Sequence, residues 1–171
     1  MANTIALPKL SFGEAIKTCF KKYATFSGRA RRSEYWWFCL LNSIPGILMQ
    51  QLISWKSGVL AEVESQAGEA LFDAEKHQAL LDKAQACDDT FFPCAAILCI
   101  IMLALLIPAL AVCARRLHDI GKSGWAMLIG IIPIVNLILI FWTLKDSEPQ
   151  ANKYGESPKY ITQEENAASQ I

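Results

Sequence analysis

Residues 92–114 read FPCAAILCIIMLALLIPALAVCA and contain no charged side chain. A helix needs about 20 such residues to cross the hydrocarbon core of a bilayer. Two further runs, 35–54 and 125–144, are also apolar and uncharged. The three runs together predict an all-α integral membrane protein with about three transmembrane helices.

The tryptophans argue against the alternative that these runs are buried helices of a soluble protein. All five lie at the ends of the first and third runs, where an amphipathic indole prefers the level of the lipid headgroups. They are Trp36, Trp37, Trp55, Trp125 and Trp142. A soluble core gives no reason for this placement. In a chain of 171 residues, 53% of them apolar, we expect one membrane domain over residues 1–160 and a flexible tail over 161–171.

The basic residues predict the orientation in the membrane. Residues 1–34 contain seven Lys or Arg against two acids, and residues 115–124 contain three against one acid. Residues 55–90 contain three Lys against eight acids. By the positive-inside rule, the first two segments are cytoplasmic and the third is extracytoplasmic. We therefore expect a multi-pass protein of the bacterial cytoplasmic (inner) membrane with its N-terminus in the cytoplasm, and no cleavable signal peptide in the first 34 residues.

The third run leaves two topologies open. Pro133 and Asn136 lie near its middle, which is compatible with a re-entrant hairpin rather than a crossing. Its length of 20 residues favours a crossing. In that case the C-terminal tail lies outside.

Two segments outside the runs also read as helices. Ser11 followed by Glu14 is a capping-box pattern, and the apolar residues after it share one face while three lysines point away. That face comprises Phe12, Ile16, Cys19, Phe20 and Tyr23, opposite Lys17, Lys21 and Lys22. This pattern indicates an amphipathic helix at the membrane interface, or alternatively a surface helix packed on protein. In 57–91, apolar or small residues recur every three or four positions, which predicts a helical extracytoplasmic insertion. They are Leu60, Val63, Ala67, Ala70, Ala74, His77, Leu81 and Ala84.

Spacing argues against a metal site. The six cysteines form no Cys-x-x-Cys pair, and the two histidines are 41 positions apart. We expect no metal, no cofactor and no nucleic-acid partner. A Cys87–Cys94 disulfide stays open if that segment faces an oxidising space.

The remaining candidate site is a charged cluster at the predicted cytoplasmic interface. It comprises Arg29, Arg31, Arg32, Glu34, Arg115, Arg116, His118 and Asp119. At an interface of intermediate polarity the arginines are the natural partners of the two carboxylates. Surplus positive charge would then face anionic headgroups. The alternative is that these charges only set the topology.

The same residues carry a family resemblance. Residues 26–36 (FSGRARRSEYW), 116–125 (RLHDIGKSGW) and 152–158 (NKYGESP) resemble the bacterial inner-membrane proteins of domain-of-unknown-function family 805. The resemblance implies a bacterial cytoplasmic membrane and a multi-span helical fold. It implies no activity, and it leaves out residues 57–91.

Two classes of function follow as expectations. The favoured one is a non-catalytic module that binds anionic lipid, a partner membrane protein or a second copy of itself through its basic cytoplasmic face. The alternative is a small-solute transporter or membrane enzyme with His118 and Asp119 as proton-handling groups. The sequence leaves open whether the protein is an enzyme and assigns no catalytic residue.

Overall fold

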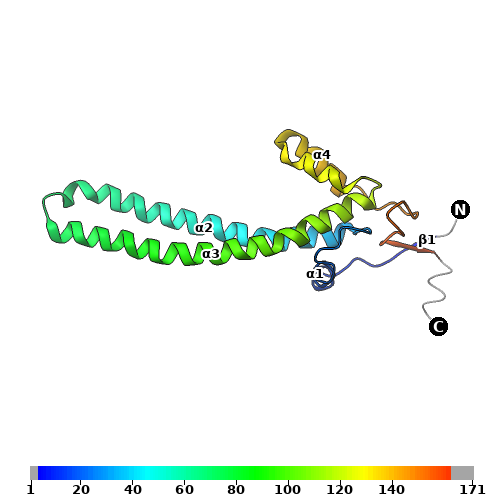
Figure 1. The fold of residues 1–171 in the computed structure, drawn as a ribbon, viewed down its shortest axis with the longest axis horizontal. Coiled ribbons are helices and arrows are strands. Elements are labelled where there is room, and N and C mark those ends of the chain that lie inside the picture. The colour runs from blue at the N-terminus through cyan, green and yellow to red at the C-terminus, as the bar shows by residue number, and fades with distance from the viewer. Residues whose placement is uncertain (1–3, 163–171) are drawn as a thin grey trace. The chain divides into compact units, whose positions relative to one another are not determined.

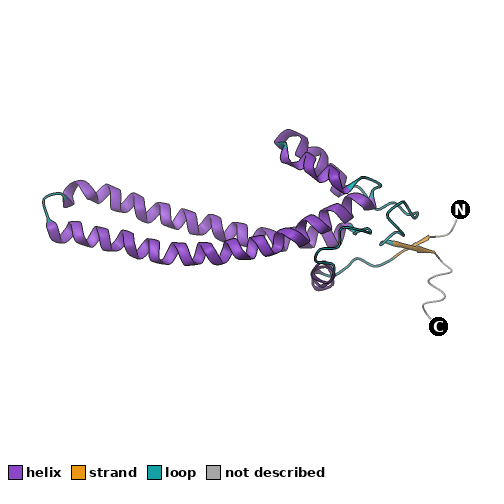
Figure 2. Cartoon of the chain, in the orientation of Figure 1, coloured by secondary structure: helices purple, strands orange, loops and turns teal. Residues whose placement is uncertain are grey.

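The computed structural model describes residues 4–162, apart from the side chains of residues 129, 131, 133–135 and 162. Figure 1 and Figure 2 show that the chain is mostly helical, as predicted. Its elements are strand β1 (Thr4–Ala6), helices α1 (Phe12–Lys21), α2 (Arg32–Ala70) and α3 (Ala74–Asp119), the 3-10 helix η1 (Gly124–Ile131), helix α4 (Pro133–Leu144) and strand β2 (Tyr160–Thr162). They form two compact units, one of residues 4–41 with 105–162 and one of residues 42–104.

The second unit is an antiparallel helical hairpin built from the end of α2 and the start of α3 (Figure 1). Two ion pairs join its helices: Lys56 Nζ lies 2.8 Å from Asp88 Oδ1, and Lys83 Nζ lies 2.7 Å from Glu62 Oε2. The Asp73 carboxylate caps α3, because it accepts hydrogen bonds from the backbone N–H groups of the two residues that follow Ala74. The predicted helical insertion is thus present, as a continuation of the two long helices.

The predicted apolar seam of this insertion is only partly right. Val63 is half-buried and Ala70 is buried, but Leu60 and Leu81 are exposed. The sequence pattern was read as one helix, whereas the turn at residues 71–73 reverses the chain and gives each helix its own inward face. His77, also in this seam, is exposed.

A Cys87–Cys94 disulfide does not form, and both thiols are free. The two residues lie in one helix, α3, seven positions apart. At a rise of about 1.5 Å per residue their Cα atoms are separated by about 10 Å, more than the roughly 7 Å that a disulfide allows.

Helix α3 contains the predicted second span, 92–114. Within residues 4–162 it is the one helix both long and apolar enough to cross a membrane, and its most apolar window has a mean hydropathy of 3.0. Only 22% of that window is buried inside the protein, so the helix is not the covered core of a soluble fold. The predicted first span, 35–54, lies within α2, where Asn42, Gln50 and Gln51 lower the mean hydropathy.

The third run, 125–144, is not one continuous helix. It forms η1 and α4, which pack against each other. At rises of about 2.0 and 1.5 Å per residue, each is shorter than the ~30 Å hydrocarbon core. Pro133 stands at the start of α4, where its missing N–H costs no hydrogen bond. The run is therefore interrupted at Ile132, next to the proline on which the re-entrant alternative depends.

Helix α1 begins with the predicted capping box: Ser11 Oγ accepts from the Glu14 N–H, and the Glu14 carboxylate accepts from the Ser11 N–H at 2.9 Å. Its inner face packs on protein, with Cys19 in a buried cluster beside Phe38 and Val112. Phe12 and Phe20 stay 43% and 45% exposed. The helix therefore packs on the protein with one face and keeps apolar side chains at its edge.

The two ends of the described chain lie together in the first unit. Strands β1 and β2 pair antiparallel with Ile5 opposite Ile161, and the Leu7 N–H donates to the Lys159 carbonyl at 2.8 Å. Residues 161 and 162, which we expected in the tail, belong to β2. Residues 163–171 lie outside the described part of the chain.

Candidate functional site

The structure brings the sequence-predicted cluster together where α2 begins and α3 ends. Arg29 and Arg31 precede α2 and Glu34 lies in its first turn, while the other members except Arg32 lie in the last turns of α3. Six of the eight residues are buried: Arg29, Arg31, Glu34, Arg115, Arg116 and Asp119. Since buried charges need partners, the contacts of each decide what the cluster does.

Arg29 makes five hydrogen bonds, as many as a guanidinium has N–H groups. Its Nε lies 3.0 Å from Asp119 Oδ1. The other four go to backbone carbonyls, one of Asp119 and three of the C-terminal segment, at Glu148, Gln150 and Gly155. Arg29 therefore fixes the path of the chain after α4.

The sequence motif at 152–158 supplies one of these carbonyls. Asn152 and Gly155 exchange backbone hydrogen bonds at 3.1 and 2.9 Å, and Gly155 adopts a positive φ of 119° that favours glycine. The Asn152 side chain donates to the His118 carbonyl at 3.0 Å. This turn presents the Gly155 carbonyl to Arg29.

Arg116 and Arg32 hold the C-terminal end of α4. Arg116 Nε donates to the Thr143 carbonyl at 3.1 Å, and its two Nη atoms bond the Lys145 carbonyl and the Asp119 carboxylate. Arg32 Nη1 donates to the Leu144 carbonyl at 3.2 Å. The last carbonyls of a helix lack partners within it and carry partial negative charge. Two guanidiniums supply both the missing donors and the favourable charge.

Arg115 joins the two long helices. Its Nη1 lies 2.6 Å from Glu34 Oε1, with both side chains almost fully buried. Its backbone carbonyl accepts from the Ala30 N–H at 3.0 Å. Cys19 Sγ lies 3.8 Å from the same Glu34 oxygen. Burial and the Glu34 carboxylate raise the pKa of this thiol to about 12, so Cys19 stays protonated and is a weak nucleophile.

Arg31 joins the two terminal segments. It donates to the carbonyls of Pro8 at 2.7 Å, of Pro158, and of Lys159 at 3.5 Å. Since Pro8 follows β1 and Lys159 precedes β2, this side chain closes the end of the small sheet.

His118 packs rather than facing an open site. Its ring stacks on Tyr154 with centroids 3.8 Å apart and an interplanar angle of 7°, and Nδ1 lies 3.1 Å from the Gly28 carbonyl. A neutral ring that donates from Nδ1 fits this carbonyl. Burial lowers the pKa of His118, the Gly28 carbonyl opposes that shift, and nearby Lys153 adds to it.

Asp119 is enclosed by cations, because Arg29 and Arg116 each bond one of its carboxylate oxygens. Burial raises the pKa of Asp119 above its ordinary value, while Ser147 and the two guanidiniums oppose that shift. In this arrangement His118 and Asp119 contact other groups of the protein, and most of the cluster's positive charge is buried. Of the five arginines, Arg32 alone is exposed.

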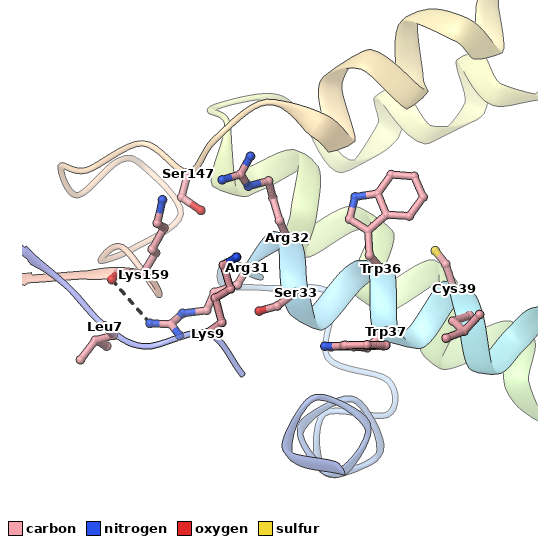
Figure 3. Close-up of a pocket in the computed structure, with 11 residues that line it drawn as sticks. Leu7, Lys9, Arg31, Arg32, Ser33, Trp36, Trp37, Cys39, Ser147 and Lys159 are labelled. Atoms are coloured by element: carbon pink, nitrogen blue, oxygen red, sulfur yellow. Dashed lines mark hydrogen bonds between the residues drawn. The ribbon is translucent and has the colours of Figure 1, made fainter. Parts of the chain in front are cut away.

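A groove of about 770 Å³ lies beside this cluster (Figure 3). We call it the cationic groove. It runs between the segment after β1, the first two turns of α2 and the C-terminal segment, and Figure 3 shows the Arg31 side chain reaching across it. Its lining residues are Leu7, Lys9, Arg31, Arg32, Ser33, Trp36, Trp37, Cys39, Leu40, Ser147 and Lys159.

The groove combines positive charge with apolar and aromatic walls. Four of its lining residues are basic and none is acidic. Asp146 reaches two of them, lying 3.1 Å from Arg32 and 2.7 Å from Lys159, and this contact raises the pKa of Lys159. One acid against four bases leaves a net positive site.

Sequence reasoning missed most of this groove. The run Arg31-Arg32-Ser33 next to Trp36 and Trp37 was a usable signal, because it places cations beside interfacial aromatic rings. Lys9, Ser147 and Lys159 gave no signal, since only the folding of both terminal segments onto α2 brings them there.

The family is settled by a profile match. The sequence profile described as "Protein of unknown function (DUF805)" matches residues 23–156. The chain belongs to this family. It is 31% identical to the inner membrane protein YhaI of Escherichia coli K12 over 141 residues, which are 82% of this chain and 91% of YhaI. It is 29% identical to the inner membrane protein YhaH of the same strain, over 81% of this chain and 91% of YhaH. No solved structure matches it.

Residues 23–156 include every member of the charged cluster and the turn at Asn152–Gly155. They exclude α1, Lys9 and Lys159. Within this chain, the cluster therefore lies in the family region and the cationic groove lies partly outside it.

Proposed function

We propose that the protein is a non-catalytic module of the bacterial inner membrane that binds anionic phospholipid at its cytoplasmic face. The location rests on the two relatives, both named inner membrane proteins, and on the exposed apolar surface of α3. The single observation that carries lipid binding is the cationic groove, because its net positive charge adjoins two tryptophans.

The proposal includes a topology of two crossings. The start of α2 and the end of α3 are joined by the Arg115–Glu34 pair, so we place them on the same side of the bilayer. If α3 crosses, the turn at residues 71–73 lies on the other side. We then infer that α2, although less apolar than α3, crosses as well because it runs to that turn. The run 125–144 begins after α3 and ends at carbonyls held by Arg116, so it enters and returns.

The distribution of charge supports a cytoplasmic location for the first unit. The basic N-terminal segment and the loop after α3 lie in the first unit, while the acidic segment 55–90 lies in the hairpin. The positive-inside rule places the first unit in the cytoplasm. Three lysines in and directly after α1 are exposed in this unit and add attraction to anionic lipid: Lys17, Lys21 and Lys22.

The alternative class, a transporter or enzyme acting through His118 and Asp119, receives no support from the geometry. The His118 ring is stacked on Tyr154 and bonded to Gly28, and Asp119 is neutralised by two guanidiniums. Groups already committed to internal partners are poorly placed to bind a solute. A loss of cellular function in His118→Gln at normal abundance and fold would restore this class.

The test measures which phospholipids are extracted from the membrane together with the protein. The full chain is extracted from bacterial membranes with a styrene–maleic acid copolymer, and the co-extracted phospholipids are quantified by mass spectrometry. We expect enrichment of anionic over zwitterionic phospholipid relative to the bulk membrane. Neutralising Lys17, Lys21 and Lys22 to Gln should reduce it, whereas Lys76→Gln in the hairpin should not. Lipid in the bulk ratio around the parent protein would overturn the proposal, and cross-linking to one abundant membrane protein would replace it with a protein-binding role.

A further inference from the structure

Beyond a general attraction to anionic lipid, the structure points to one discrete site for it. We propose that the cationic groove binds a single anionic glycerophospholipid, with the phosphate at Lys9, Arg32 and Lys159 and one acyl chain along Trp36 and Leu40. This inference rests on the proposed function and names the place where it acts.

The charge of the groove selects an anion. The Lys9, Arg31, Arg32 and Lys159 side chains line it, and Asp146 offsets part of the charge of two of them. Arg31 donates to backbone carbonyls, so it contributes charge. The Lys159 ammonium group contacts the Asp146 carboxylate, so a bound phosphate would share or replace that partner. The Lys9 side chain is exposed. A phosphate offers several acceptor oxygens to such donors, and charge-assisted hydrogen bonds are the strong ones.

The walls of the groove select an amphiphile rather than a free anion. Trp36 is 41% exposed and Leu40, one helical turn further along α2, is 54% exposed. Residues four apart lie on the same helix face, so an apolar track leads from the cations toward the predicted span. Figure 3 shows Trp36 and Trp37 on either side of α2 at this point. Indoles mark the headgroup level of a bilayer, so the cations lie where lipid phosphates lie.

The size of the groove fits a headgroup with the start of a chain. Its 770 Å³ falls within the roughly 300–1,000 Å³ typical of small-molecule sites. A whole diacyl lipid does not need to fit, because the remaining chain length stays in the bilayer. Ser33, in the first turn of α2, adds a hydroxyl donor at the same end.

The experiment counts bound lipid on the full chain in detergent by native mass spectrometry. The probes are dioleoyl phosphatidylglycerol, dioleoyl phosphatidylcholine and, as a soluble headgroup, glycerol phosphate. The main variant is Lys9→Gln with Lys159→Gln, and its matched control is Lys76→Gln with Lys83→Gln in the hairpin. A second variant, Ser33→Phe, fills the groove and leaves every cation in place. Near-native circular dichroism is required of each variant.

The expected result is one phosphatidylglycerol on the parent chain and a dissociation constant raised about tenfold or more in both groove variants, equivalent to about 1.4 kcal/mol. The control pair should bind like the parent. Equal binding by the parent and both groove variants would overturn this site while leaving the proposed function intact. No preference for phosphatidylglycerol over phosphatidylcholine in the parent would overturn both. Displacement by millimolar glycerol phosphate alone would show an anion site and overturn the lipid assignment.

Discussion

Single charged side chains decide the architecture of the first unit, because each buried arginine is bonded to a segment distant in sequence. Arg29 reaches residues about 120 positions away, and Arg31 joins both terminal segments. A buried charge that loses its partner costs far more than an exposed one. Substitutions at this scale therefore separate structural charges from charges that only orient the chain.

The Glu34–Arg115 pair offers the sharpest test. In Glu34→Gln the Arg115 guanidinium stays buried without its counter-charge, so we expect a loss of about 3 kcal/mol in the free energy of unfolding. Chemical unfolding in a mild detergent, followed by circular dichroism, measures it. Glu62→Gln breaks a pair whose side chains are 53% and 40% exposed and should cost at most about 1 kcal/mol. Equal stability of the two variants would mean that the Glu34 carboxylate contributes only to topology.

His118 makes stability depend on pH. Its pKa in the folded protein lies below the ordinary 6.5 because of burial, so the unfolded chain binds a proton more readily than the folded one. The contribution of neutral His118 to the free energy of unfolding is complete above pH 6.5. It is lost as the pH falls through that value toward the pKa of His118 in the folded protein. Thermal unfolding between pH 7.5 and 5 should show this decline in the parent and a weaker one in His118→Gln. An unchanged slope in His118→Gln would contradict the assignment.

At the scale of elements, the end of α3 shows how the chain is turned back. Gly121, with a φ of 73°, follows the last helical turn, and the N–H groups of Lys122 and Gly121 donate to the carbonyls of Leu117 and His118. This is a Schellman motif, in which a left-handed residue closes the helix. It directs the chain into η1, and so the motif 116–125 acts as a helix stop.

Gly121→Ala should weaken this stop. The new side chain requires a left-handed conformation that costs roughly 1 kcal/mol, and its Cβ would lie 3.0 Å from Glu148 Oε1. We expect a measurable fall in the denaturation midpoint. Gly58→Ala, in the helical interior of α2 with no atom within 4 Å of the new Cβ, should raise stability by up to about 1 kcal/mol. A neutral Gly121→Ala would show that the turn tolerates a right-handed alternative.

At the scale of the whole molecule, the pairing of β1 with β2 constrains the topology. Strand residues Thr4–Ala6 and Tyr160–Thr162 are hydrogen-bonded partners, so they lie on the same side of any membrane. An odd number of crossings between them is incompatible with this contact. This contact favours the proposed topology, in which the two long helices cross and the run 125–144 does not.

Cysteine labelling tests this topology on a Cys-free full chain in intact cells. Glu64→Cys, in the hairpin, should react with a membrane-impermeant maleimide without lysis. Glu156→Cys, near the turn that Arg29 holds, should react only after the membrane is breached. Both positions are exposed, so accessibility within the protein is matched. Reaction of the cysteine at 156 from outside would restore the third crossing and contradict the β1–β2 arrangement.

Much of the fold was predictable from local properties of the sequence. Hydropathy over about 20 residues identified the span in α3, and the Ser11–Glu14 spacing identified the start of α1. The residue types of the cluster were also predictable, because carboxylates at a membrane interface need cationic partners and Arg is the residue nearby. These signals depend on neighbours within one helix or one turn.

The sequence by itself determined that this is a helical membrane protein with a basic face and a charged cluster. Only the tertiary structure decided that the third run is broken into η1 and α4, that the arginines bind the carbonyls of residues 143–159, and that Lys9 and Lys159 share a groove. The physical reason is that hydropathy and periodicity depend on the types of the side chains, which the sequence states directly. A backbone carbonyl is present in every residue, so the sequence does not distinguish one carbonyl from another. Which carbonyl receives a given arginine depends on the path of the folded chain.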